Sequence, residues 1–217
     1  MGFLQEKDKE HIRNMFKDLS GEVKLILFTQ EIECQYCRET RQILQEVSEL
    51  SDKIKLQVHN FVTDKEIADK YTIDKIPATV IEGTKDYGIR YYGIPSGYEF
   101  SSLLEDILDV SRGDSGLSDQ SKALLKEITA PLRLQVFVTP TCPYCPRAVR
   151  LAHKMAIENN NITGDMVEAT EFPHLSMKYN VRGVPRTMIG EEIPIEGAIP
   201  ENEFVKRVVE AFKQMNN

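Results

Sequence analysis

The chain has 217 residues, of which 41% are hydrophobic and 28% charged, and its formal net charge is -7. This length fits one large domain or two of about 100 residues. The acidic balance argues against nucleic acid and against an anionic membrane as partners, because both are bound by clustered Lys and Arg. The charged N-terminus and the absence of an apolar run near the ~20 residues of a membrane span predict a cytoplasmic location.

Apolar periodicity predicts the same order of elements in both halves of the chain: a helix, a strand, a cysteine pair that opens a second helix, and a second strand. A short helix, an X-Pro step, two further strands and a last helix complete each half. In the first half we expect helices over 9–19 and 100–111 and strands over 25–28 and 54–59. In the second half the corresponding ranges are 119–128, 203–215, 134–138 and 164–169, with Ser118 as a helix cap.

The two halves are copies of each other. An offset of 108 residues maps the first cysteine pair onto the second, and also maps Tyr71–Thr79 onto Tyr179–Thr187. Similarity in fixed order over a hundred residues indicates a duplicated domain. The turn-forming stretch 112–116 is the best boundary, which gives domains of residues 1–115 and 116–217 that pack against each other. Each domain is predicted to be an α/β layered unit around one sheet.

All four cysteines lie in two Cys-x-x-Cys pairs, Cys34/Cys37 and Cys142/Cys145, each placed where a strand turns into a helix. The free N–H groups and the positive dipole of a helix N-terminus stabilise a thiolate, and so lower the pKa of the first cysteine. We therefore assign Cys34 and Cys142 as nucleophiles. Cys37 and Cys145, one helical turn later, are the resolving thiols that attack a mixed disulfide.

Two X-Pro steps recur at the same distance from the cysteine pairs, Ile76-Pro77 and Val184-Pro185. We expect both prolines to follow a cis bond and to face the cysteine turn, with the backbone of Ile76 and Val184 free to pair with an extended substrate. A proline that merely ends a loop before a strand is the alternative. The tyrosines inside the two motifs line the substrate groove or lie at the solvent surface; they are Tyr36 and Tyr144.

Cys142-Pro-Tyr-Cys145 is the glutaredoxin active-site tetrapeptide, and Cys34-Gln-Tyr-Cys37 is a close variant. With the two X-Pro steps, nearly the whole chain resembles the double-glutaredoxin protein disulfide oxidoreductases of thermophilic archaea and bacteria. The resemblance implies an α/β protein with two tandem thioredoxin-like folds, each a central mixed four-stranded sheet flanked by helices. It also implies an enzyme, a protein-disulfide oxidoreductase or isomerase, that reduces, oxidises or isomerises protein disulfides. No cofactor is implied, since NADPH would act only indirectly through a thioredoxin reductase.

The sequence departs from these relatives where glutathione and protons are handled. The stretch 196–201 lacks the Gly-Gly-Asp segment that helps glutaredoxins to hold glutathione, and the strands before the cysteines lack the buried Asp of thioredoxins. The group that accepts the proton of the resolving thiol is therefore not identified by sequence. None of the four histidines shares a spacing with the cysteines, and we expect all of them at the surface.

Three other functions compete with general disulfide exchange. One is a dedicated electron donor that links thioredoxin reductase to a peroxidase such as a peroxiredoxin. Another is a binding protein whose four cysteines hold zinc, although 104 residues separate the two pairs and zinc sites of this type usually hold them ~15–20 residues apart. A scaffold with two structural disulfides is the last, and bridges that close such short loops would stabilise it little.

The two cysteine sites are predicted to differ in charge. The charged residues near Cys142 are all basic, whereas acidic and basic residues mix around Cys34. These are Arg147, Arg150 and Lys154 at the second site, and Glu31, Glu33, Glu39, Arg38 and Arg41 at the first. Positive charge favours a thiolate. We therefore expect the lower pKa and the more oxidising potential at the second site, unless salt screens these exposed charges.

Overall fold

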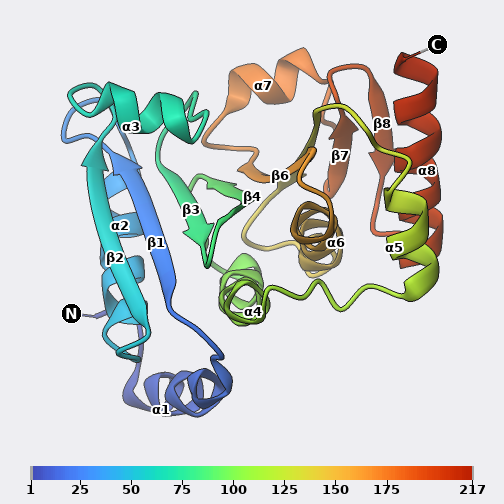
Figure 1. Ribbon diagram of the computed structural model, residues 1–217. Helices are drawn as coiled ribbons and strands as arrows, with labels where there is room; N and C mark the ends of the chain where they lie inside the picture. The colour runs from blue at the N-terminus through green and yellow to red at the C-terminus, as the bar shows by residue number, and fades with distance from the viewer. Residues whose placement is uncertain (1, 217) are drawn as a thin grey trace.

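A computed structural model describes residues 2–216 as one mixed eight-stranded sheet with helices on both faces (Figure 1). The strand order is β2-β1-β3-β4-β6-β5-β7-β8. The elements of the first half are α1 (Glu6–Met15), η1 (Phe16–Asp18), β1 (Val23–Thr29), α2 (Cys37–Ser48), β2 (Ile54–Asn60), α3 (Lys65–Lys70), β3 (Ala78–Glu82), β4 (Asp86–Tyr92) and α4 (Glu99–Arg112). Those of the second half are α5 (Asp119–Leu125), β5 (Leu132–Val138), α6 (Cys145–Glu158), β6 (Ile162–Glu168), α7 (Pro173–Lys178), β7 (Arg186–Ile189), β8 (Ile193–Glu196) and α8 (Glu201–Met215).

Each half contributes four strands with the same pairing. β1 runs parallel to β2 and antiparallel to β3, which pairs antiparallel with β4. In the second half β5 pairs with β6 and β7 in the same senses, and β7 pairs antiparallel with β8. The predicted fold class is confirmed: two tandem units, each with a mixed four-stranded sheet flanked by helices.

The two four-stranded halves join into one sheet, which the sequence did not predict. β4 pairs parallel with β6, from Ile89 opposite Gly164 to Tyr92 opposite Val167. Gly88 precedes this pairing with a φ of +85°, and a Cβ atom there would lie 2.7 Å from the carbonyl oxygen of Ile162. Glycine tolerates both the backbone angle and the close approach. The join, which we call the β4–β6 seam, makes the two units neighbours within one sheet.

The faces of the sheet carry separate hydrophobic cores. Alternate strand residues point to opposite faces, so Leu25 and Leu27 enter one core while Ile26 and Phe28 enter the other. Helices α1, α2, α4, α5, α6 and α8 cover the first core, and α3 and α7 cover the second. Figure 1 shows α3 and α7 along one side of the sheet and α4 beside α6 on the opposite side.

The predicted elements all exist, with shifted ends. The first helix begins at Glu6 and gives way to a 3-10 turn at Phe16, and strands β5 and β6 each begin two residues before the predicted start. Ser118 caps α5 by accepting a hydrogen bond from the N–H of Ser121, as predicted. Gly113 ends α4 in the left-handed conformation, inside the expected boundary. None of the helices in residues 2–216 combines the length and apolar character needed to cross a bilayer.

Candidate active site

Both cysteine pairs form disulfides at strand-to-helix turns, and in each pair the two Cα atoms are 5.5 Å apart. Helix α2 begins at Cys37 and α6 at Cys145, with the motif tyrosines at the N-cap positions. Cys34 and Cys142 therefore precede the first helical turn. This is where helix N–H groups point toward a sulfur atom.

In each pair the second cysteine is more deeply buried than the first. Cys37 is 2% exposed and Cys145 is fully buried, whereas Cys34 is partly exposed and Cys142 is 8% exposed. The backbone N–H of Cys145 donates to Cys142 Sγ at 3.2 Å. A backbone donor at this distance stabilises negative charge on that sulfur once the disulfide is reduced. The first cysteine of each pair is thus the more exposed of the two, and its role as nucleophile stays a prediction.

The two X-Pro bonds are cis, as expected. The carbonyl oxygen of Val184 lies 3.7 Å from Cys142 Sγ, so this loop faces the second disulfide. Each cis-proline carbonyl accepts a hydrogen bond from a glycine N–H, Gly93 to Pro77 at 2.9 Å and Gly197 to Pro185 at 2.8 Å. The loops have the same local support in both units. Contact of Ile76, Pro77, Val184 and Pro185 with a substrate stays a prediction.

The motif tyrosines are accessible but differ in degree. Tyr144 is 63% exposed, and Tyr36 is partly exposed. Their positions fit a substrate groove and a solvent surface equally. At the first site an open pocket of about 640 Å³ reaches both cysteines and is bordered by Arg38, Arg41 and Val58 among others.

Arg150, one of the basic residues predicted to act near Cys142, is buried and paired with carboxylates. Arg150 is 8% exposed, and its guanidinium is paired with Glu105 at 3.2 Å, with Asp106 and with Asp109. Three carboxylates neutralise it, so it cannot be counted as free positive charge near Cys142. The predicted difference in thiol pKa then rests on the remaining basic residues and stays a prediction.

One histidine is not at the surface, contrary to expectation. His153 is fully buried, and its Nδ1 lies 2.6 Å from Asp106 Oδ2. Burial, together with the nearby charge of Arg150, lowers the pKa of His153 to about 3. The burial of His153 was not expected because His153 lies outside the predicted apolar stripe of α6. It lies with Arg150, three residues before it, on the side of α6 that contacts Asp106 of α4. His11 and His174 are exposed, and His59 is partly exposed.

A buried carboxylate that the sequence did not single out lies beside the second site. Glu99, at the start of α4, is 1% exposed. The N–H of the preceding Tyr98 donates to the carbonyl of Pro140 at 3.0 Å, and a Cβ on Gly97 would lie 2.1 Å from that oxygen. The start of α4 is therefore pressed against the segment that leads into Cys142.

The environment of Glu99 favours its protonated form. Burial raises the pKa of Glu99 to about 7, against the lowering effect of the Ser102 hydroxyl, which donates to Oε2 at 2.8 Å. Its Oε1 has no hydrogen-bond partner among residues 2–216. The only available signal was the repeat of Glu99-Phe100 as Glu203-Phe204. That signal was ambiguous because Glu203 is half-exposed and pairs with Arg207.

The structure gives no cluster suited to a metal ion. Across residues 2–216, no group of three or more His, Cys, Asp or Glu side chains is arranged to hold one. The thiols that a four-cysteine zinc site would use are engaged in two disulfides, one in each unit.

Comparison with known proteins places this geometry in a family. The family model described as "Thioredoxin domain" matches residues 22–105 and 132–210. A protein disulfide oxidoreductase from Aeropyrum pernix K1 superposes with a TM-score of 0.91 at 29% identity, covering 97% of this chain and 94% of that one. The alkylhydroperoxide reductase component AhpF from Enterococcus faecalis gives a TM-score of 0.87 at 26% identity, covering 95% and 99%.

The chain is also similar in sequence to a curated protein. The corresponding alkyl hydroperoxide reductase component of Staphylococcus epidermidis is 27% identical over 190 residues, which are 85% of this chain and 34% of the relative. The chain thus spans about a third of the length of the curated relatives it matches. Because the family model covers most of both halves, the chain belongs to the thioredoxin-domain family and carries two such units in tandem.

Proposed function

We propose that the protein is a thiol–disulfide oxidoreductase that exchanges disulfides with protein substrates at two sites. The observation that carries the proposal is the pairing, in each unit, of a Cys-x-x-Cys disulfide at a helix start with a cis-proline step. Its similarity to a protein disulfide oxidoreductase over nearly the whole chain supports this. The reaction needs no bound cofactor, because the electrons reside in the dithiols.

In the reducing direction, the thiolate of Cys34 or Cys142 attacks one sulfur of a substrate disulfide. A mixed disulfide forms, and the other substrate sulfur leaves as a thiolate that takes up a proton. Cys37 or Cys145, once deprotonated, then attacks its partner cysteine and releases the second substrate thiol. Two electrons pass from the enzyme dithiol to the substrate, and the enzyme keeps the disulfide. Oxidation of a substrate dithiol is the same sequence in reverse.

The substrate is held by its backbone in this proposal. The Val184 carbonyl, 3.7 Å from Cys142 Sγ, is placed to accept a hydrogen bond from an extended peptide beside the attacked sulfur. Ile76 takes the same part at the first site. Backbone pairing gives affinity with little dependence on side chains, which suits an enzyme that acts on many proteins.

Glu99 is our candidate for the proton acceptor of Cys145. A carboxyl group with a pKa near the working pH can take a proton from a thiol and return it, and the pKa of Glu99 is about 7. Glu99 belongs to the first unit, but the residue before it, Tyr98, is hydrogen-bonded to Pro140 in the segment that leads into Cys142. It therefore serves the site of the neighbouring unit, not that of its own.

A narrower role as an electron donor to a peroxide-reducing partner is the second candidate. The similarity to the AhpF component of alkyl hydroperoxide reductases favours it. In this case a thioredoxin reductase would pass electrons from NADPH to one cysteine pair, and a peroxiredoxin would take them from the other. Both candidates place the protein in the cytoplasm and share the same chemistry.

The test is reduction of insulin by dithiothreitol in the presence of the protein. We expect wild type to accelerate it, and the variants Cys34→Ser/Cys37→Ser and Cys142→Ser/Cys145→Ser each to retain the activity of the intact site. The variant without all four cysteines should lose at least about a hundredfold. A quadruple variant as active as wild type would disprove the proposal. NADPH-dependent peroxide consumption, with a thioredoxin reductase and a peroxiredoxin added, separates the second candidate from the first.

A further inference from the structure

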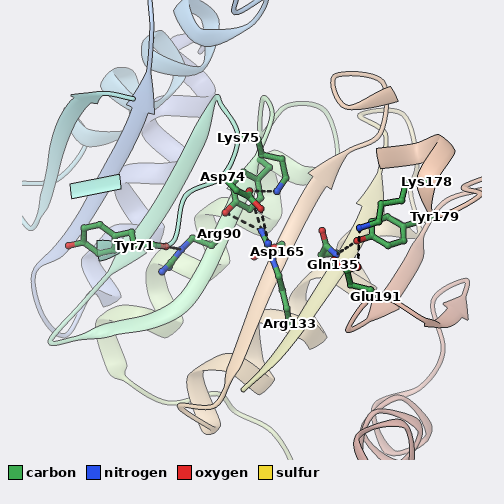
Figure 2. Close-up of polar contacts among 11 residues, drawn as sticks. Tyr71, Asp74, Lys75, Arg90, Arg133, Gln135, Asp165, Lys178, Tyr179 and Glu191 are labelled. Carbon is green, nitrogen blue, oxygen red and sulfur yellow. Dashed lines mark hydrogen bonds and ion pairs between the residues drawn. The ribbon is translucent and has the colours of Figure 1, made fainter. Parts of the chain in front are cut away.

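In the first unit, the loop that carries cis-Pro77 contacts the second unit through an ion pair. Asp74 and Lys75 directly precede Ile76 and cis-Pro77. Arg133, on β5 of the second unit, donates from Nη1 to Asp74 Oδ2 at 2.8 Å and from Nη2 to Asp74 Oδ1 at 3.4 Å. Figure 2 shows this contact reaching across from one unit to the other.

Arg133 is itself held by the core of its own unit. Its Nε donates to Oδ2 of Asp165 at 2.5 Å, and Asp165, in the middle of β6, is fully buried. A guanidinium presents its donors in a rigid fork, so one group can bind a fixed carboxylate with Nε and a loop carboxylate with the other nitrogens. Arg133 is therefore a link between the core of the second unit and the loop of the first.

Lys75 makes further contacts that hold the same loop in place. Lys75 pairs with Asp74 at 2.5 Å, and its Nζ lies 3.7 Å from the centroid of the Tyr92 ring. Burial would raise the pKa of Asp74, but the hydrogen bond from Arg133 and the charges of Lys75 and Arg133 bring it down to about 2. The ion pair therefore remains charged throughout the neutral range.

The corresponding loop of the second unit has no such anchor in its sequence. By the 108-residue offset, Asp74 and Lys75 become Arg182 and Gly183, both exposed. Arg182 donates to Asn180, two residues away in its own loop, at 3.0 Å. Local support from the glycine N–H groups is the same in both units, so Arg133 is what distinguishes the first loop.

We infer that Arg133 is a positioning residue for the first site: it holds the Asp74–Pro77 loop where the backbone of Ile76 can pair with a substrate next to Cys34. The inference rests on the proposed function. Arg133 acts through the loop and touches neither the cysteines of the first site nor the substrate. It makes peptide binding at one redox site depend on a side chain of the other unit.

The experiment uses the full chain with only the first site intact, Cys142→Ser/Cys145→Ser. In this background we expect Arg133→Met and Asp74→Asn each to raise KM for insulin about two- to fivefold with kcat unchanged. Reduction of 5,5'-dithiobis(2-nitrobenzoic acid), a small disulfide that has no peptide backbone to pair, should be unaffected. Arg133→Lys keeps the charge without the fork and should restore part of the insulin KM.

Two controls separate positioning from general stability. Lys178→Met removes an exposed ion pair with Glu191 and should change neither KM. In the complementary background Cys34→Ser/Cys37→Ser, Arg133→Met should leave the second site unchanged. Asp74→Asn preserves the contact between Arg133 and Asp165, so it remains informative if Arg133→Met does not fold.

The inference is overturned if insulin KM at the first site is unchanged in Asp74→Asn, or if both sites and both substrates weaken together. The second result would show a structural role alone. An inactive first site in the parent background, with Arg133 intact, would instead count against the proposed function. The two failures are therefore distinguishable.

Discussion

The two redox sites have the same local design but different neighbours in the sheet. Cys34 follows β1, whose neighbour β2 forms an outer edge of the sheet among residues 2–216, whereas Cys142 follows β5, whose neighbour β6 is covered by β4. The second site consequently has the first unit beside it, with Glu99 packed near its loop. The difference shows that duplicated units become unequal simply because one of them has a neighbour on the side where the other faces solvent.

The largest effect should come from breaking the helix pair that joins the units behind the second site. Arg150→Met on α6 leaves the fully buried Asp106 of α4 without its cation. Removing one partner of a buried pair is costly, and we expect the free energy of unfolding to fall by about 3 kcal/mol. Urea denaturation followed by circular dichroism measures this. Arg207→Met, which breaks an exposed pair with Glu203, is the control, and an equal loss there would contradict the prediction.

Glu99 should affect the two sites unequally. Glu99→Gln should slow insulin reduction at the second site about tenfold and flatten its pH dependence near pH 7, with the first site unchanged. Glu203→Gln, at the equivalent place in the second unit, should have no effect because Glu203 is half-exposed. Equal slowing of both sites in Glu99→Gln would remove Glu99 as the proton acceptor.

Glu99 should also lower the free energy of unfolding at neutral pH and above. Because its pKa is raised to about 7 in the folded chain, the folded state binds a proton that the unfolded state has released. The free energy of unfolding therefore falls as the pH rises from about 4.5 to 7. Glu99→Gln should be more stable than wild type at pH 8, by about 2 kcal/mol. A variant that is less stable than wild type at that pH would contradict this.

The buried histidine gives an effect of opposite slope, confined to acid pH. The pKa of His153 is lowered to about 3, so below about pH 6.5 the unfolded chain binds a proton that the folded chain does not. This group lowers the free energy of unfolding as the pH falls from 6.5 toward 3, by about 1 kcal/mol per pH unit. The difference between wild type and His153→Gln should carry this slope, whereas the exposed His174→Gln should not. Parallel curves for wild type and His153→Gln would refute it.

The smallest effect is the difference in thiol pKa between the sites. With Arg150 neutralised by its three carboxylates, only Arg147 and Lys154 are left of the basic residues on which the prediction was based, and salt screens exposed charges. We expect the pKa of Cys142 to lie below that of Cys34, because positive charge favours the thiolate. The pH dependence of iodoacetamide alkylation in Cys34→Ser and Cys142→Ser measures both. A higher value at Cys142 would end this idea.

The elements and the chemistry could be read from the sequence because each leaves a local signature. Periodicity located the helices and strands, and the 108-residue repeat of the cysteine pairs and Pro77/Pro185 located the sites. The β4–β6 seam could not be read, since it is made of backbone hydrogen bonds between strands of ordinary composition. Arg133 and Asp165 likewise look like polar residues on any half-exposed strand until their partners in the folded chain are known.

Glu99 illustrates the same limit more sharply. Glu99-Phe100 and Glu203-Phe204 are the same dipeptide at the start of equivalent helices, and only their surroundings differ. The Glu99 carboxylate is 1% exposed, whereas that of Glu203 is half-exposed and pairs with Arg207. No property of the dipeptide distinguishes a buried carboxyl group from a surface ion pair, because the difference lies entirely in what the fold packs against it.

Strand β4 pairs in parallel with β6 of the next unit, and a further strand could in principle pair with the outer strand β8 in the same way. Strand β8 occupies in the second unit the place of β4 in the first. Arg90 pairs with Val80, and Pro194 pairs with Met188, the equivalent of Val80 by the 108-residue offset, so Pro194 takes the place of Arg90. Proline has no N–H to offer a further strand, and β8 has four residues where β4 has seven. A short, proline-bearing outer strand discourages polymerisation by edge association. At this edge the sheet thus offers a further strand little backbone to pair with.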